Sequence, residues 1–89
     1  MRVRYTREAQ SQIKAIFDYI SADNEAAARQ GIADIRSSLE HLAEFPLIGK
    51  QTDVLGVRQF VATRHAYIAF YIIAGDIFII SILHRSRSR

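Results

Sequence analysis

The sequence predicts an α+β domain with the element order β-α-α-β-β-β, in which a two-helix hairpin packs on one face of a four-stranded antiparallel sheet. Two observations support this prediction. Apolar residues recur at helical spacing up to residue 44, and from residue 57 onward they follow the spacing of strands. Between the two halves lie Pro46, Gly49 and Gly56, which indicate a loop. With 89 residues, the chain is expected to form a single domain, 1–89.

The first half of the chain carries start and stop signals for two helices. Thr6 is a suitable N-cap for a first helix that ends near Ser21. Asp23 or Asn24 can cap the second helix, which Pro46 ends because the residue before a proline avoids helical backbone angles. The link between the helices is so short that they are expected to pack antiparallel. The apolar stripes are Ala9, Ile13, Ile16, Phe17 and Ile20, and then Ala28, Ile32, Ile35, Leu39, Leu42 and Ala43.

Four segments are expected to form the strands: 2–5, 57–62, 66–73 and 77–83. Residues 63–65 are predicted to turn the first hairpin and residues 74–76 the second, where Gly75 can adopt a positive φ. The last strand is apolar on both faces, so it is expected at the centre of the sheet, between 66–73 and 2–5. Simple alternation along this strand would place His84 on the same side as Phe78, Ile80 and Ile82.

The helical hairpin is too small to cover both faces of this sheet. The strand at 66–73 offers apolar side chains to both sides: Ile68, Phe70 and Ile72 on one, and Tyr67, Tyr71 and Ile73 on the other. One face is therefore expected to keep an apolar patch, which usually marks a partner site. The alternative is that tail or loop residues fold over it.

Composition and charge exclude several classes of site. The chain has no cysteine, and its three histidines are too dispersed for zinc, so neither a metal nor a cofactor is expected. It shows neither a signal region nor a membrane-spanning run, so a cytoplasmic protein is expected. Residues 50–89 hold six basic and two acidic residues, a net charge of +4, which favours an acidic partner. The basic tail, 85–89, is expected to be flexible.

No phosphate-binding glycine loop, nucleophile elbow or zinc-binding helix is present. Arg58 lies in an otherwise apolar strand and is expected to face solvent or an acidic group, because an unpaired buried guanidinium is costly. It is equally well explained as an edge-strand charge that discourages aggregation. His84 is either a structural residue or a general acid or base. The full basic and aromatic set is Lys50, Arg58, Arg64, His65, Tyr67, Tyr71, His84 and Arg85.

Segments along nearly the whole chain carry a family resemblance. They are 3–9, 16–20, 24–29, 39–49 with its Leu–Phe–Pro–Gly pattern, 57–60, 67–71 and 79–85. Their order and spacing resemble the ParE branch of the RelE/ParE toxin superfamily, the toxin half of bacterial type II toxin–antitoxin modules. The resemblance implies the same RelE/ParE-like fold.

The resemblance also implies a function. A ParE-like chain would inhibit growth by acting on DNA gyrase, without catalysis, and a ParD-like cognate antitoxin would neutralise it in a hetero-oligomer. The target-binding candidates are Arg58, Arg64, Tyr71, His84 and Arg85, and the antitoxin-binding candidates are Tyr67, Tyr71, Ile73 and Ile79.

Two alternatives remain. The first is a ribosome-dependent mRNA endonuclease of the RelE type, with Arg58, His84 and Arg85 as catalytic candidates. His84 resembles a histidine at the same strand end in YoeB-type nucleases, but no tyrosine follows it and no glutamate follows Glu44, so the gyrase-directed hypothesis is favoured. The second is a nucleic-acid-binding module that uses the basic tail.

Overall fold

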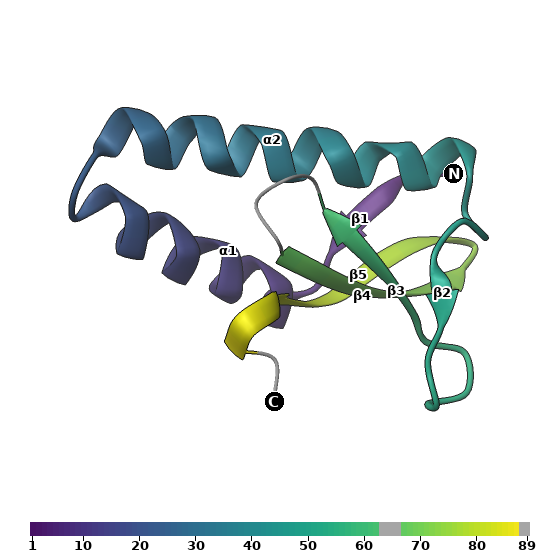
Figure 1. The fold of residues 1–89 in the computed structure, drawn as a ribbon. Coiled ribbons are helices and arrows are strands. Elements are labelled where there is room, and N and C mark those ends of the chain that lie inside the picture. Colours follow the sequence, from purple (N-terminus) through teal and green to yellow (C-terminus); the bar gives the residue numbers. More distant parts are fainter. Residues whose placement is uncertain (63–66, 88–89) are drawn as a thin grey trace.

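The computed structural model describes residues 1–62 and 67–87 and shows two helices packed on one face of a five-stranded sheet (Figure 1). The strand order across the sheet is β1-β5-β4-β3-β2. The predicted α+β class and the helical hairpin on one face are confirmed. In chain order the elements are β1 (Val3–Tyr5), α1 (Arg7–Ser21), α2 (Glu25–Glu44), β2 (Lys50–Gln51), β3 (Arg58–Ala62), β4 (Tyr67–Ala74), β5 (Asp76–His84) and a 3-10 helix (Arg85–Arg87).

Both helices begin and end where the sequence predicts. The Thr6 side chain accepts a hydrogen bond from the Ala9 N–H at 3.2 Å, and the Asn24 side chain accepts one from the Ala27 N–H at 3.0 Å. Each bond satisfies one of the backbone donors that a helix N-terminus leaves unpaired. The second helix stops at Glu44, before Pro46.

The sheet differs from the prediction in two respects. It has a fifth strand, β2, which pairs with β3 for two residues only, and β1 pairs with β5 in parallel rather than antiparallel. The helical hairpin returns the chain to the end of the sheet where β1 begins, and the antiparallel pairings of β3 with β4 and of β4 with β5 then reverse its direction twice. For this reason β5 runs in the same direction as β1. The predicted central position of β5, between β1 and β4, is confirmed.

A β-bulge in β5 changes which side chains face the helices. Phe70 pairs with Ser81 and Tyr71 with Ile79, so Ile80 is the extra residue on the bulged strand. The extra residue shifts the alternation by one position. His84 therefore does not share a side with Phe78, as simple alternation predicted, but lies on the helix-facing side.

The core lies between the helices and this side of the sheet. Its buried members from the helices come from the predicted stripes, and each large one contributes about 1.5–3 kcal/mol by leaving water. The turn from β4 to β5 has Gly75 at φ +78°, as predicted. The predicted turn at 63–65 lies outside the described residues. The buried residues of the core are Ala9, Ile13, Ile35, Leu39, Leu42, Ala62, Tyr67, Ala69, Tyr71, Ile77, Ile79 and Ile82.

Candidate functional site

Arg58 and Tyr71, two predicted target-binding residues, hold a loop of the protein itself. They are paired on β3 and β4. The Arg58 Nη1 donates to the backbone oxygens of Gly49 at 2.7 Å and Leu47 at 3.3 Å. The Tyr71 hydroxyl donates to the Pro46 oxygen at 2.7 Å and accepts from the Gly49 N–H at 2.9 Å. The partners of the guanidinium are therefore backbone carbonyls and not an acidic group, and the side chain is partly exposed to solvent, the other alternative that the sequence left open.

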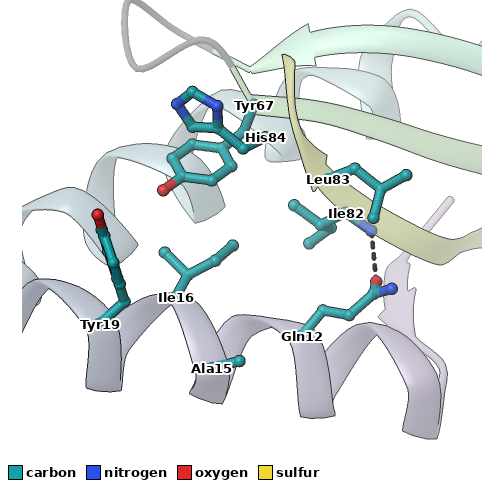
Figure 2. Close-up of a pocket in the computed structure, with 8 residues that line it drawn as sticks. All are labelled: Gln12, Ala15, Ile16, Tyr19, Tyr67, Ile82, Leu83 and His84. Atoms are coloured by element: carbon teal, nitrogen blue, oxygen red, sulfur yellow. Dashed lines mark hydrogen bonds between the residues drawn. The ribbon is translucent and has the colours of Figure 1, made fainter. Parts of the chain in front are cut away.

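His84 lies at the other end of the sheet, in a cleft between α1 and the end of β5 (Figure 2). Its ring meets Tyr67 edge-on, with the ring centroids 5.1 Å apart, and its Nδ1 contacts the Ser86 Oγ at 2.7 Å. The cleft has a volume of about 200 Å³ and is lined by Gln12, Ala15, Ile16, Tyr19, Tyr67, Ile82, Leu83 and His84. These described lining residues include no lysine or arginine, so the cleft suits an apolar side chain better than a phosphate.

Gln12 joins the two walls of this cleft. The Ile82 N–H on β5 donates to its side-chain oxygen at 2.6 Å (Figure 2). The β1 partner of β5 reaches only as far as Ile79, so this glutamine satisfies a strand donor that lies beyond the end of β1. Sequence reasoning missed this role, because an amide on a helix gives no sign of the distant strand it will meet.

Of the candidate nuclease residues, Arg58 is separated from the neighbouring residues His84 and Arg85. The Arg58–Tyr71 pair and the Tyr67–His84 pair are four positions apart along β4, which is roughly 13 Å in an extended strand. Arg85 follows β5 and is exposed in the 3-10 helix. The remaining target-binding candidate, Arg64, lies outside the described residues.

The antitoxin-binding candidates lie on the side of the sheet that the helices cover. Tyr71 and Ile79 are fully buried, Tyr67 is 6% exposed, and Ile73 is partly buried against the core. None of the three buried side chains is accessible to a partner in this conformation. A partner that binds the sheet must meet the opposite side.

That opposite side, here called the open face, consists of apolar side chains in cross-strand rows. Val61, Ile68 and Leu83 form one row, and Phe70 lies between Gln59 and Ser81 in the next. The helices do not lie over this side (Figure 1). The members of the open face are Val61, Ile68, Phe70, Ile72, Phe78 and Leu83, all partly or fully exposed. This is the apolar patch expected from the sequence.

A second set of exposed apolar side chains was not predicted. Leu47, Ile48, Val54 and Leu55 are all more than half exposed and flank the short strand β2. The sequence contains a sign of this exposed set. These residues are as apolar as those of the core, but they fit neither the helical nor the strand spacing. The sequence pattern predicts only that they belong to a loop.

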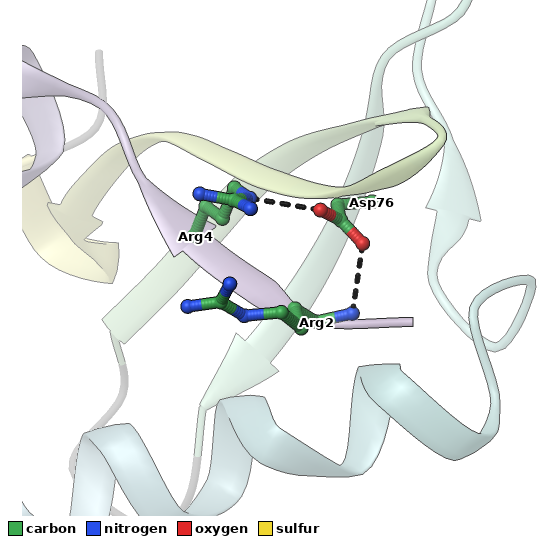
Figure 3. Close-up of polar contacts among 3 residues, drawn as sticks. All are labelled: Arg2, Arg4 and Asp76. Atoms are coloured by element: carbon green, nitrogen blue, oxygen red, sulfur yellow. Dashed lines mark hydrogen bonds and ion pairs between the residues drawn. The ribbon is translucent and has the colours of Figure 1, made fainter.

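Charged residues tie β1 to the β4–β5 hairpin (Figure 3). The Arg4 Nε donates to the Asp76 carboxylate at 2.8 Å, and the Arg2 backbone N–H donates to its other oxygen at 3.0 Å. The hydrogen bond from Arg4, and then that from Arg2, lower the pKa of Asp76. The ionised carboxylate therefore joins the strand that precedes the helices to the last strand.

Replacing Asp76 with asparagine should lower stability at neutral pH and have less effect in acid. Because folding lowers the pKa of Asp76, its contribution is present above the unfolded value of about 4 and is lost as pH falls through the folded value. Urea unfolding of the parent and of Asp76→Asn between pH 3 and 7 measures the difference. Arg4→Gln removes the same ion pair and should reproduce the effect. If the difference in unfolding free energy between parent and variant stays the same from pH 3 to pH 7, this prediction is wrong.

Within the described residues, no group of three or more His, Asp or Glu side chains is placed to hold a metal ion. Neither α1 nor α2 is long and apolar enough to cross a membrane.

Comparison with known proteins identifies the family. A sequence model described as "ParE toxin of type II toxin-antitoxin system, parDE" matches residues 3–89. "Putative toxin Y4kP" of Sinorhizobium fredii is 31% identical over 83 residues, which cover 93% of this chain and 86% of that protein. A solved structure described as "Chromosomal ParDE TA system from P. aeruginosa" matches with a TM-score of 0.83 at 26% identity, covering 94% of this chain and 95% of that one.

Fold and family model together define a toxin of a type II toxin–antitoxin system. The chain belongs to the ParE toxin family. The resemblance inferred from the sequence is thereby confirmed.

Proposed function

We propose that this toxin inhibits DNA gyrase by binding to it, catalyses no reaction itself, and is neutralised by a cognate antitoxin. Gyrase is a cytoplasmic enzyme, so the proposed place of action is the cytoplasm. The competing function within the superfamily is mRNA cleavage on the ribosome.

The separation of the basic candidates carries the proposal. Cleaving RNA requires a group that activates the 2′-hydroxyl, a group that protonates the leaving oxygen and cations on one phosphate, all within a few ångströms of each other. Arg58 and His84 are roughly 13 Å apart along the sheet, and Arg58 already donates to two backbone carbonyls. This arrangement supports a binding function better than a catalytic one.

The open face supports the antitoxin part of the proposal. Phe70 and Phe78 are only partly buried there, so a partner on this face would remove further apolar surface from water. The half of the chain that contributes most of this face has a net charge of +4, which suits an acidic segment. The matched Pseudomonas structure is itself described as a ParDE system. An apolar and acidic antitoxin segment over the open face is consistent with these observations.

Two parallel assays test the proposed target. The purified toxin is added to gyrase in a DNA supercoiling assay and to translating ribosomes in an mRNA cleavage assay, each with a His84→Ala variant. Supercoiling should be inhibited in proportion to toxin concentration, and mRNA should remain intact. Cleavage of mRNA that disappears in His84→Ala, together with normal supercoiling, would establish the nuclease function instead.

A further inference from the structure

The loop between α2 and β3 gathers most of the exposed apolar surface. Of the eight large apolar side chains that are exposed in the described part of the chain, five lie in this loop, here called the braced loop (residues 45–57). They are Phe45, Leu47, Ile48, Val54 and Leu55. Val54 is 60% exposed and Leu55 is completely exposed, and these two residues are called the tip.

The braced loop is held in one conformation. At its start, Tyr71 and Arg58 together make four hydrogen bonds to Pro46, Leu47 and Gly49, as described above. Near the tip, the Thr52 hydroxyl donates to the Val57 oxygen at 2.9 Å and accepts from the Val54 N–H at 3.1 Å. A loop already fixed in its bound shape loses little conformational entropy on binding. Exposed apolar side chains that lie together in this way often mark an interaction site.

Charge and shape indicate what kind of partner would fit. The only charged side chains in the braced loop are Lys50 and Asp53, which balance each other. Nucleic acids are bound mainly through uncompensated Lys and Arg, so a neutral aliphatic tip does not suit them. The segment between β2 and β3 extends beyond the sheet (Figure 1), and Leu55 at its tip is completely exposed, although one side of the segment borders a hollow of about 360 Å³. Extended peptides bind to grooves and sheet edges, whereas an exposed aliphatic side chain on a protruding loop fits a pocket in a folded protein.

We propose that the tip, Val54 and Leu55, inserts into an apolar pocket on the folded protein that this toxin inhibits. The inference rests on the proposed function, since it takes that protein to be gyrase. On this proposal, Arg58 and Tyr71 position the braced loop and do not contact the target themselves.

The test compares a tip variant, Val54→Ser with Leu55→Ser, with the parent. Both side chains lie outside the core, so the thermal unfolding temperature and antitoxin affinity should not change. Growth arrest in cells and inhibition of purified gyrase should each require about tenfold more toxin, a loss within what the burial of two aliphatic side chains contributes. Because the contact is apolar, the parent's affinity for gyrase should depend little on salt. Ala33→Ser, at an exposed position of α2 that belongs to neither the tip nor the open face, is the control and should match the parent. Leu55→Met keeps an apolar side chain at the tip and should keep the parent's activity.

The possible results test the role of the tip separately from the identity of the target. A tip variant that arrests growth as strongly as the parent would overturn the inference, whichever target is correct. A parent that arrests growth but leaves gyrase unaffected would overturn gyrase as the target, and the loss of arrest in the tip variant would still support the inference. Loss of antitoxin binding with growth arrest intact would assign the tip to the antitoxin and overturn the inference. Self-association of the parent that the tip variant lacks, again with arrest intact, would assign the tip to a second copy and overturn it as well.

Discussion

Replacing Gly49 with alanine should lower the free energy of unfolding by roughly 3 kcal/mol, through overpacking and the disruption of buried hydrogen bonds. A Cβ at this position would clash with the Tyr71 hydroxyl, lie 2.6 Å from the Tyr71 Cε1 and lie 2.9 Å from the Gln59 oxygen. Tyr71 is fully buried and cannot move aside without opening the core. Urea unfolding of the purified variant measures the loss.

Gly31→Ala is the matched control. Gly31 is buried in α2, but its added Cβ would lie 3.7 Å from the Ile20 Cδ1, which is ordinary van der Waals contact. Alanine favours the helix over glycine by up to about 1 kcal/mol, so this variant should be neutral or more stable. Equal destabilisation by the two substitutions would show that the close approach of Gly49 to Tyr71 is not what matters.

The helices could be predicted because their signals are local. Thr6 and Asn24 contact backbone groups three residues away, and Pro46 restricts the residue next to it. The sheet was predicted less completely, because strand direction and register depend on residues far apart in the chain. The parallel pairing of β1 with β5 joins Val3 to Ile77, which no local pattern encodes.

The residues of the candidate site were also predictable where their signals are local, and not where they depend on contacts between distant residues. The sequence predicted that Arg58 faces solvent or an acidic group, and the side chain is partly exposed but donates to backbone carbonyls. The sequence could not identify these partners, because they are the backbone carbonyls of Leu47 and Gly49, which any residue type could supply. Likewise, the alternation of β4 predicted two apolar faces. Which face the helices cover depends on how the hairpin packs, and so Tyr71 and Ile79 were assigned to a partner although they lie in the core.

A glutamate in place of Phe70 should abolish neutralisation by the antitoxin and leave the toxin folded. Phe70 is partly exposed at the middle of the open face, between Gln59 and Ser81, so a carboxylate there can remain hydrated in the free toxin. Under an apolar and acidic antitoxin segment the same carboxylate would be buried without a partner, at a cost of about 3 kcal/mol or more. The affinity should therefore fall at least about 100-fold by titration calorimetry. Cells that express both proteins should stop growing.

Ala33→Glu adds the same charge at an exposed position of α2 and serves as the control. It should keep the parent's antitoxin affinity, because α2 lies on the other side of the sheet from the open face. Phe70→Leu keeps the face apolar and should bind within a few-fold of the parent. If Ala33→Glu loses the antitoxin and Phe70→Glu binds it normally, the antitoxin covers the helical hairpin rather than the open face. The exposed apolar rows of β4 and β5 would then be available to the toxin's target.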